Sequence, residues 1–201
     1  MIRPAPNIEW QVEAVNHVDR VLKIVTATLD AARIPYAVIG GNAVATWVAT
    51  RDVGAVRATK DVDLLLDRSN LEVAARALAP HGFVQAEVLG IPIFVESADP
   101  LPSRGVHVIL ANEKVRETSR YAAPGVKSAI RSASGYLVLD LESLLMMKLD
   151  AYRRVDKVHI EDLLRIGLVD SEMGSGLPQD LRDRLRHIRD TMEWFSEPPE
   201  F

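Results

Sequence analysis

The sequence has no cysteine, no strong excess of either charge and no long apolar run, and each absence excludes a class of protein. Without cysteine the chain forms neither a disulfide framework nor a thiolate metal site, which fits a reducing compartment. No apolar stretch is long enough to span a membrane, and the start MIRPAPNIEW lacks the apolar region of a signal peptide. These features predict a soluble, cytoplasmic protein.

The charge balance argues against one further class. The 24 Lys and Arg residues against 28 Asp and Glu residues give a formal net charge of −4. Strong non-specific binding to nucleic acid depends on many Lys and Arg contacts to phosphates, so it is not expected here. With 48% hydrophobic and 26% charged residues in 201, the chain has the composition of a globular protein with a proper core.

Hydrophobic periodicity predicts alternating helices and strands, followed by helices alone. Apolar residues at three- and four-residue steps indicate helices, and short apolar runs bounded by turn residues indicate strands. Helices are expected over 8–32, 42–50, 69–82, 141–154, 160–169 and 178–195, and strands over 36–41, 60–67, 83–88, 91–97 and 105–111. Asn42 is the expected N-cap of the second helix.

This order of elements predicts an α+β fold, or an α/β fold with a mixed sheet. Residues 1–112 are expected to form a core with an N-terminal helix. Residues 113–195 are expected to form a C-terminal helical region packed on that core, and 196–201 a tail.

Two carboxylates interrupt an otherwise apolar strand, in the segment RATKDVDLLLD. Asp61 and Asp63 are two residues apart, so their side chains leave a strand on the same face. A charged carboxylate in an apolar strand is costly unless something neutralises it. Two hard oxygen ligands on one face suit a Mg²⁺ ion that also carries phosphate oxygens.

A double glycine follows the preceding strand and opens a helix. Glycine lets backbone approach another group closely, and the N-terminal amides of a helix suit a phosphate. Taken alone, Gly40-Gly41 is more often a turn, and Asp-x-Asp at a strand end is more often a solvated edge or a cap. The combined order of strand, Gly-Gly, helix and acidic strand favours a nucleotide site over a metal-binding α+β domain with a chance Asp-x-Asp.

At these residues the sequence resembles the polymerase-beta-like nucleotidyltransferase superfamily. VIGGNAVATW followed by RATKDVDLLLD is similar to its signature, and the Arg-x-Thr-x-Asp-x-Asp-Leu form at 57–64 is similar to a bacterial branch. That branch includes abortive-infection nucleotidyltransferase toxins and small-molecule nucleotidyltransferases. LESLLMMKLDAYRRVDKVHIEDLLRIG also looks like this branch, so the resemblance extends from about residue 36 to residue 167.

The resemblance implies a nucleotidyltransferase-like core with flanking helices and a metal-dependent reaction. An NMP would move from an NTP to an acceptor hydroxyl of unidentified identity, with release of pyrophosphate and with Mg²⁺ or Mn²⁺ as cofactor. Asp61 and Asp63 would be catalytic and would bind the metal. The residues implied to bind nucleotide are Gly40, Gly41, Asn42, Arg57, Thr59 and Lys148. Asp162 would be a structural or site-lining acid, and Arg153 and Arg154 would either extend the triphosphate face or be solvated.

Two features depart from the family pattern. First, 19 residues lie between Gly41 and Asp61, more than the family usually has, and the loop TRDVGAV accounts for the excess and is a candidate for acceptor specificity. Second, the strand GVHVILA carries His107 where the family usually has a third acid. Glu96 and Glu113 are the acids on neighbouring segments that could replace its charge.

His107 leaves two interpretations open. A neutral imidazole can act as a general base near pH 7, although as a ligand it suits Mn²⁺ or Zn²⁺ better than Mg²⁺. The alternative is a strand histidine satisfied by its neighbours with no catalytic part. That alternative favours a catalytically degenerate protein that binds or regulates a protein partner, for example in a toxin–antitoxin pair, whereas the intact Asp61 and Asp63 favour an enzyme.

Overall fold

The structure, a computed structural model, describes residues 8–170 and 172–192. Within these ranges it has six α-helices and one mixed seven-stranded sheet, which confirms the predicted α+β class. The elements in chain order are α1 (Ile8–Ala31), β1 (Tyr36–Ile39), α2 (Gly40–Ala49), β2 (Val62–Leu66), α3 (Leu71–Leu78), β3 (Phe83–Val88), β4 (Ile91–Glu96), β5 (Val106–Leu110), β6 (Ala129–Arg131), β7 (Leu137–Leu139), α4 (Leu141–Ala151), α5 (Arg154–Arg165) and α6 (Gln179–Thr191).

The sheet brings the two motifs together at its centre. Its strand order is β3-β4-β5-β2-β1-β7-β6, so β2 has β1 on one side and β5 on the other. β1 and β2 are antiparallel with Ile39 opposite Asp63, and β2 and β5 are parallel with Asp63 opposite His107. The end of β1, which leads into the double glycine, therefore lies beside the acidic end of β2.

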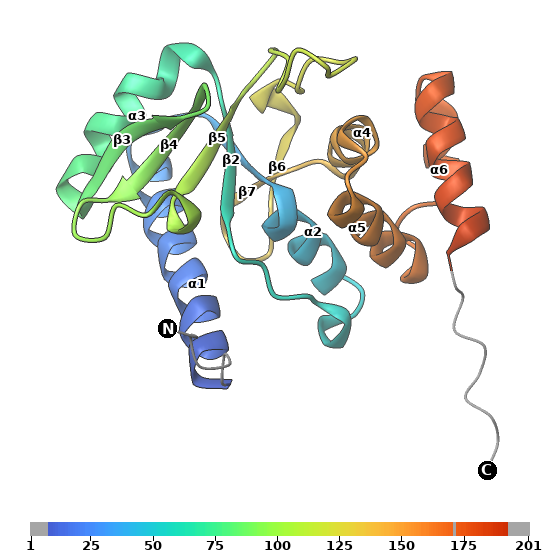
Figure 1. The fold of residues 1–201 in the computed structure, drawn as a ribbon, viewed down its shortest axis with the longest axis horizontal. Helices are drawn as coiled ribbons and strands as arrows, with labels where there is room; N and C mark the ends of the chain where they lie inside the picture. The colour runs from blue at the N-terminus through green and yellow to red at the C-terminus, as the bar shows by residue number, and fades with distance from the viewer. Residues whose placement is uncertain (1–7, 171, 193–201) are drawn as a thin grey trace, which may run out of the picture.

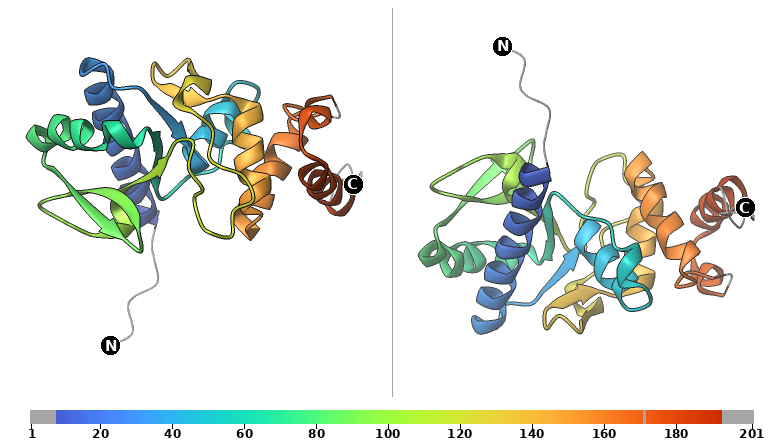
Figure 2. Two further views of the ribbon diagram at one scale, coloured as in Figure 1. Left: turned by 90° about the horizontal axis from the view of Figure 1, so that it is seen from above. Right: turned by 90° about the horizontal axis from the view of Figure 1, so that it is seen from below.

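The period-two alternation of β2 explains how it carries an acid in an apolar run. Val62, Leu64 and Leu66 point into the core formed with α1 and α3. Leu65 points to the opposite face and packs in the core that includes residues of α2, α4, α5 and α6. Asp63 shares that second face at the end of the strand. The two groups of helices lie on opposite sides of the sheet, with α6 outermost beyond α4 and α5 (Figures 1 and 2).

The expected N-cap of the second helix is wrong. α2 begins at Gly40, not at Asn42, and its N-cap is Ile39, which makes no side-chain capping hydrogen bond. Gly40 has a φ of +68°, a conformation that glycine adopts without a Cβ clash. The chain therefore passes directly from strand to helix at the first glycine, and Asn42 lies inside the first turn, where its side chain has another function.

Two strands were not expected. Residues 129–139 form the β6–β7 hairpin within the segment predicted to be helical, and β7 pairs in parallel with β1. Each strand has only three residues, too few for a period-two pattern to be detected. Helices dominate only from α4 onward, and the expected tail 196–201 lies outside the described residues. No helix in the described ranges has the length and apolar character needed to cross a membrane.

Candidate nucleotide site

The Gly40-Gly41 turn is shaped by close contact with two segments. A Cβ at Gly40 would overlap Oδ2 of Asp63, and a Cβ at Gly41 would lie 2.8 Å from Cγ2 of Thr59. The two glycines therefore allow the N-terminus of α2 to approach both the acidic strand and the loop that precedes it. This is the close approach that a Gly-Gly pair predicts, here toward protein groups.

Asp63 and His107 form a pair across the parallel strands. His107 Nδ1 lies 3.5 Å from Asp63 Oδ1, and both side chains are about one-third exposed. The hydrogen bond that the Asp63 carboxylate accepts from the ring raises the pKa of His107, and burial opposes this rise. A hydrogen bond to the Pro102 backbone carbonyl raises the pKa further. An imidazole that faces two acceptors donates to both only as the imidazolium. The neighbouring carboxylate therefore stabilises the protonated form of His107 relative to the neutral form.

Asp61 lies just before β2 and completes a cluster of three titratable groups. Desolvation is the main cause that raises the pKa of the Asp61 carboxyl, and the negative charge of Asp63 raises that pKa further. His107 acts in the opposite direction. Two neighbouring carboxylates repel each other when both are ionised, and a cation between them would remove that cost.

Asn42 connects the first turn of α2 to the loop before β2. Its Oδ1 accepts a hydrogen bond of 3.0 Å from Thr59 Oγ1, and its Nδ2 donates to the Asp61 carbonyl at 2.8 Å. The side chain is buried. Asn42 and Thr59, both expected at the nucleotide, therefore hold the backbone of Asp61 in place.

Arg57 points away from the acidic strand and pairs with Asp162 on α5. Its Nε and Nη2 donate to the two carboxylate oxygens at 2.6 and 3.0 Å, in a two-pronged geometry. Asp162 is largely buried while Arg57 remains more than half exposed. The pair ties the loop that carries Arg57 to the C-terminal helices.

A second buried ion pair connects α4 to the start of α5. Lys148 Nζ lies 3.2 Å from Asp156 Oδ1, and Arg153 Nε donates to Asp156 Oδ2 at 2.7 Å. Asp156 Oδ2 also accepts from the Arg153 backbone amide, which closes a capping box. Burial lowers the pKa of Lys148, and the carboxylate of Asp156 partly offsets this. Sequence reasoning did not identify Asp156, although Asp at the third position of a helix is a capping signal.

These groups surround a cavity of about 380 Å³. Asp63 and His107 line it from the sheet and Gly40 from the start of α2. Lys148 of α4, the N-cap Arg153 and Asp156 of α5 line it from the C-terminal helices. Asp61, Asn42, Thr59 and Arg57 do not line it. The cavity therefore has Asp63 and His107 on one wall and the Lys148–Asp156–Arg153 ion pairs on another.

The remaining wall is the irregular segment 111–125, which sequence reasoning left without a role. Tyr121 and Arg120 both bond to Asp180 of α6, at 2.7 and 2.8 Å, and fix the segment in place. The segment contributes Arg116 to the cavity lining, and Arg116 makes no ion pair with any residue in the described ranges. Its sequence has no motif that marks this position.

The two acids considered as replacements for the missing third carboxylate lie elsewhere. Glu96 bonds to Arg20 at 2.8 Å, and Glu113 forms a two-pronged pair with Arg68. Neither lines the cavity, and neither does Arg154. Among residues 8–170 and 172–192, no group of three or more His, Asp or Glu residues is arranged to hold a metal ion.

Comparison with known proteins gives similarity at the level of structure. No family model and no curated protein sequence matches the chain. The solution structure of the antibiotic-resistance factor ANT(2″)-Ia is similar with a TM-score of 0.53 and 17% identity, over 88% of this chain and 92% of that chain. The crystal structure of ANT(2″)-Ia in complex with adenylyl-2″-tobramycin is similar with a TM-score of 0.52 and 18% identity, over 84% and 96%. The shared strand and helix arrangement shows that this chain has the polymerase-beta-like nucleotidyltransferase fold.

Proposed function

We propose that the protein is a metal-dependent nucleotidyltransferase that moves an NMP from an NTP to an acceptor hydroxyl and releases pyrophosphate. The observation that carries this proposal is the cavity in which Asp63 and the Gly40 turn face Lys148, Arg153 and Arg116. A nucleoside triphosphate needs cations for its phosphate oxygens and acids for the metal that accompanies it. The cavity provides the cations and Asp63, while Asp61 lies just outside its lining, two residues before Asp63.

The carboxylates of Asp61 and Asp63 are suited to hold one hard cation and not two. Asp61 and Asp63 provide carboxylate oxygens. Desolvation, and then the charge of Asp63, raise the pKa of Asp61, and a divalent cation would offset both effects. A protonated His107 offers no lone pair to a metal. Asp61 and Asp63 would therefore hold Mg²⁺ or Mn²⁺, which would polarise the phosphoryl oxygens when bound.

The chain's own residues would position the triphosphate and restrain its charge. The first amides of α2 point along the helix axis, where the helix dipole favours an anion. Arg116 carries no partner among the described residues and is available to phosphate oxygens. Arg153 is about half exposed but donates to Asp156, so it would act together with that carboxylate. Lys148 is buried on Asp156 and would act mainly by placing its charge near the phosphates. Positioning and electrostatics would thus supply most of the rate enhancement.

The acceptor is a small molecule with a hydroxyl group in this proposal. The related structure of ANT(2″)-Ia contains adenylyl-2″-tobramycin, an adenylylated aminoglycoside. The acceptor proton would pass to His107 in its neutral form, or to Asp61 or Asp63. A labelled NTP incubated with a panel of hydroxyl-bearing compounds would identify the acceptor by transfer of the label.

A second function is favoured by one observation. His107 lies next to Asp63, and in its protonated form it would replace part of the charge that a metal would supply. A protein with this pair locked in place would bind a nucleotide or a protein partner without turnover, as one component of a toxin–antitoxin pair would. Transfer of label to no acceptor, together with NTP binding that needs no metal, would support this alternative.

The deciding experiment is thermal stabilisation by each NTP with Mg²⁺ and with Mn²⁺. Ligand that binds only the native state raises the melting temperature with concentration. We expect a metal-dependent shift for the wild type and none for the double variant Asp61→Asn/Asp63→Asn. No shift with any NTP, or an equal shift in the double variant, would rule out the proposed site.

A further inference from the structure

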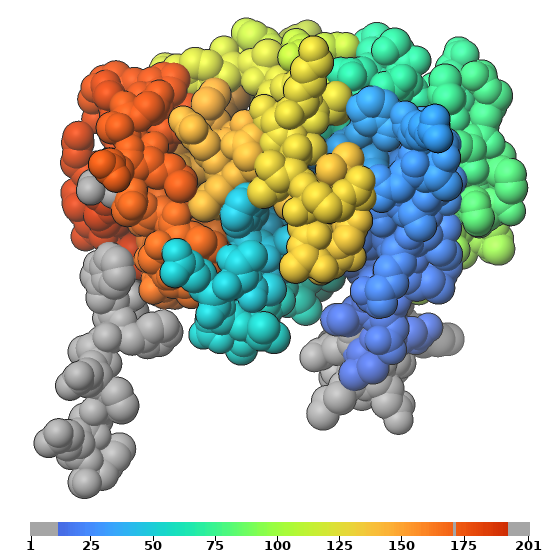
Figure 3. Space-filling view, turned by 180° about the vertical axis from the view of Figure 1, so that it is seen from behind, coloured from blue at the N-terminus to red at the C-terminus, as the bar shows by residue number. Residues whose placement is uncertain are grey.

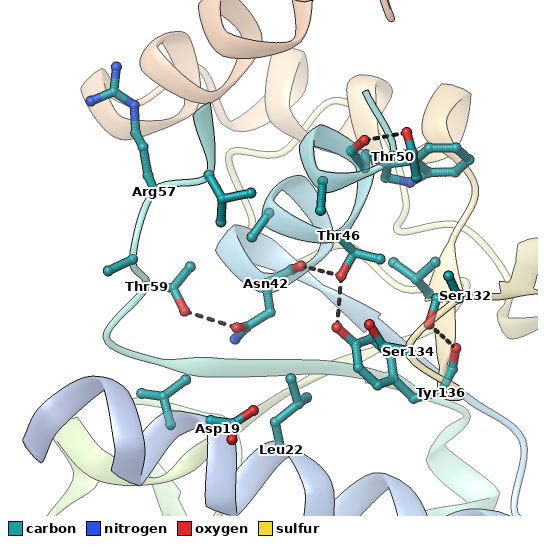
Figure 4. A pocket seen from close by; sticks show the side chains of 18 of the residues that line it. Asp19, Leu22, Asn42, Thr46, Thr50, Arg57, Thr59, Ser132, Ser134 and Tyr136 are labelled. Atoms are coloured by element: carbon teal, nitrogen blue, oxygen red, sulfur yellow. Dashed lines mark hydrogen bonds between the residues drawn. The ribbon is translucent and has the colours of Figure 1, made fainter. Parts of the chain in front are cut away.

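A second cavity of about 420 Å³ shares no lining residue with the first. It lies between α1, α2, the loop at 56–59 and the β6–β7 hairpin. These segments, far apart in the sequence, meet on the face of the molecule seen in Figure 3. Figure 4 shows the side chains of this cavity, with Thr46, Ser134 and Tyr136 grouped opposite Asp19 and Leu22 of α1. Asn42, Arg57 and Thr59, which the sequence motifs linked to nucleotide, line this cavity and not the first.

Every charged residue in the wall of this cavity is already paired. Asp19 bonds to Lys23 at 2.7 Å, and Arg57 bonds to Asp162 at 2.6 Å. Arg131 bonds to Asp30 at 2.7 Å. A charged ligand would lose hydration here and gain no free counter-charge, which is costly. This cavity therefore offers a phosphate no unpaired cation, whereas the first cavity offers Arg116.

The uncharged part of the wall combines apolar side chains with hydroxyls. Val15, Val56 and Ile130 keep between 38% and 43% of their surface exposed here. Trp47 and Tyr136 add aromatic surface. Hydroxyls of Thr46, Ser134 and Tyr136 face the same space, as Figure 4 shows. A wall of this kind, with a volume in the usual range of ligand sites, suits a ring compound with polar groups on one edge.

One wall of this cavity connects to the acidic strand of the first site. The Tyr136 hydroxyl and Thr46 Oγ1 lie 2.8 Å apart, and Thr46 donates to the Asn42 carbonyl at 2.7 Å. The Asn42 side chain in turn donates to the Asp61 carbonyl, as described above. Only Thr46 and Asn42 therefore separate the Tyr136 hydroxyl from the backbone of Asp61. A ligand in the cavity would touch that hydroxyl.

We propose that this cavity is a second binding site, for an uncharged ring compound that carries hydroxyl or carbonyl groups. Its occupancy displaces the Tyr136–Thr46 pair and is transmitted through Asn42 to the backbone of Asp61. The binding step depends only on the residues of this cavity and does not require nucleotidyl transfer. A failure of the probes to bind this cavity and a failure of nucleotidyl transfer are therefore separate results.

The test uses the full chain, ¹⁵N-labelled, with phenol and indole as uncharged probes and benzoate as a charged one. We expect saturable amide shifts around Thr46 and Tyr136 with the uncharged probes, and benzoate binding at least about tenfold weaker because its charge has no partner. Absence of shifts with both uncharged probes, or equal binding of benzoate, would overturn the proposal.

Cavity-filling variants locate the binding. Ala45 lines the cavity on α2, so Ala45→Phe should abolish the probe shifts. Ala27 is exposed on α1 and does not line the cavity, so Ala27→Phe is the matched control and should bind as the wild type does. Ser134→Trp fills the same space from the exposed hairpin and decides the result if Ala45→Phe does not fold. Binding that survives a folded filled variant would place the probe elsewhere.

A third variant separates binding from transmission. Thr46→Val keeps the shape of the wall and removes the hydroxyl that links Tyr136 to Asn42. We expect the probes to bind this variant while the shift at the Asp61 amide disappears. An unchanged Asp61 shift in Thr46→Val would show that occupancy is not transmitted through Asn42.

Discussion

At the scale of single residues, the geometry of the first site depends on the missing side chain of Gly40. The carboxylate of Asp63 occupies the space that a Cβ would need, and the φ of +68° carries the chain from β1 into α2. The same glycine thus sets the helix start and the position of the acid. The backbone conformation at Gly40 affects stability, and the position of the Asp63 carboxylate affects nucleotide binding, so the two effects can be measured separately.

Gly40→Ala should lose both stability and nucleotide binding. A non-glycine residue in the left-handed region costs about 1–2 kcal/mol, and the new Cβ must also displace Asp63. Gly167→Ala is the matched control, because Gly167 has a φ of +69° and nothing within 4 Å of the added Cβ. Urea unfolding should show a loss in both variants, with the larger loss in Gly40→Ala. Only Gly40→Ala should lose the NTP-induced thermal shift; retention of that shift would mean that Asp63 is not held by this turn.

His107 should make stability depend on pH in a defined direction. Its pKa is raised in the folded state, chiefly by the hydrogen bond with Asp63, above the ordinary value of about 6.5. The stabilisation is therefore fully present below the ordinary pKa and is lost as pH rises through the raised value. The free energy of unfolding of wild type minus that of His107→Gln should fall as pH rises above about 6.5. His187, exposed on α6, provides the control variant His187→Gln, and an equal pH dependence in both variants would contradict the role of Asp63.

At the scale of elements, the loop between α2 and β2 is held at two points. Arg57 fixes it to α5 through Asp162, and Thr59 fixes it to α2 through Asn42. The loop ends at Asp61, so its anchoring determines where the first acid lies. This gives a structural reason for the Arg-x-Thr-x-Asp-x-Asp spacing that the sequence analysis linked to nucleotide.

Two variants distinguish anchoring from phosphate contact by Arg57. If Arg57 only anchors the loop, Arg57→Met and Asp162→Asn should weaken NTP binding to the same extent. Their double-mutant coupling in urea unfolding should be about 1 kcal/mol or less, because the guanidinium is largely exposed. A loss of NTP affinity in Arg57→Met that is much larger than in Asp162→Asn would instead assign Arg57 to the phosphates.

The elements that the sequence predicted are those with a local signal. β1, β2 and α2 were predictable because apolar runs, a double glycine and alternating acids mark them within a few residues. The three-residue strands β6 and β7 exist because β1 offers a free edge to β7, and no property of residues 129–139 alone shows that edge.

The same limit applies to the candidate site. Asp61, Asp63 and His107 were proposed from short sequence motifs, and the pairing of β2 with β5 places Asp63 opposite His107. Arg116 was not, because its position depends on distant contacts between its segment and Asp180. Likewise, Asn42 was assigned as a cap because asparagine favours caps, whereas Gly40 moved the helix start and left Asn42 to bond the loop.

At the scale of the whole molecule, one sheet separates two cores that both depend on it. Residues of α1 and α3 cover one face, and residues of α2, α4, α5 and α6 cover the other. Ala37, Ile39 and Leu65 on the second face are almost fully buried. Much of the cover for these residues comes from beyond residue 112, so a division of the chain at that point would cut through a core.

The isolated segment 1–112 should therefore not fold cooperatively. It would lose α4, α5 and α6 from one face of the sheet and β7 from the edge of β1. Exposure of this apolar surface costs roughly 25 cal/mol for each Å², and a domain with a net stability of only about 5–15 kcal/mol cannot absorb such a loss. Thermal unfolding followed by circular dichroism should show one sharp transition for the full chain and a shallow, non-cooperative change for the segment. A sharp transition in the segment would establish 1–112 as an independent domain and would mean that the C-terminal helices are added to a core that is already stable.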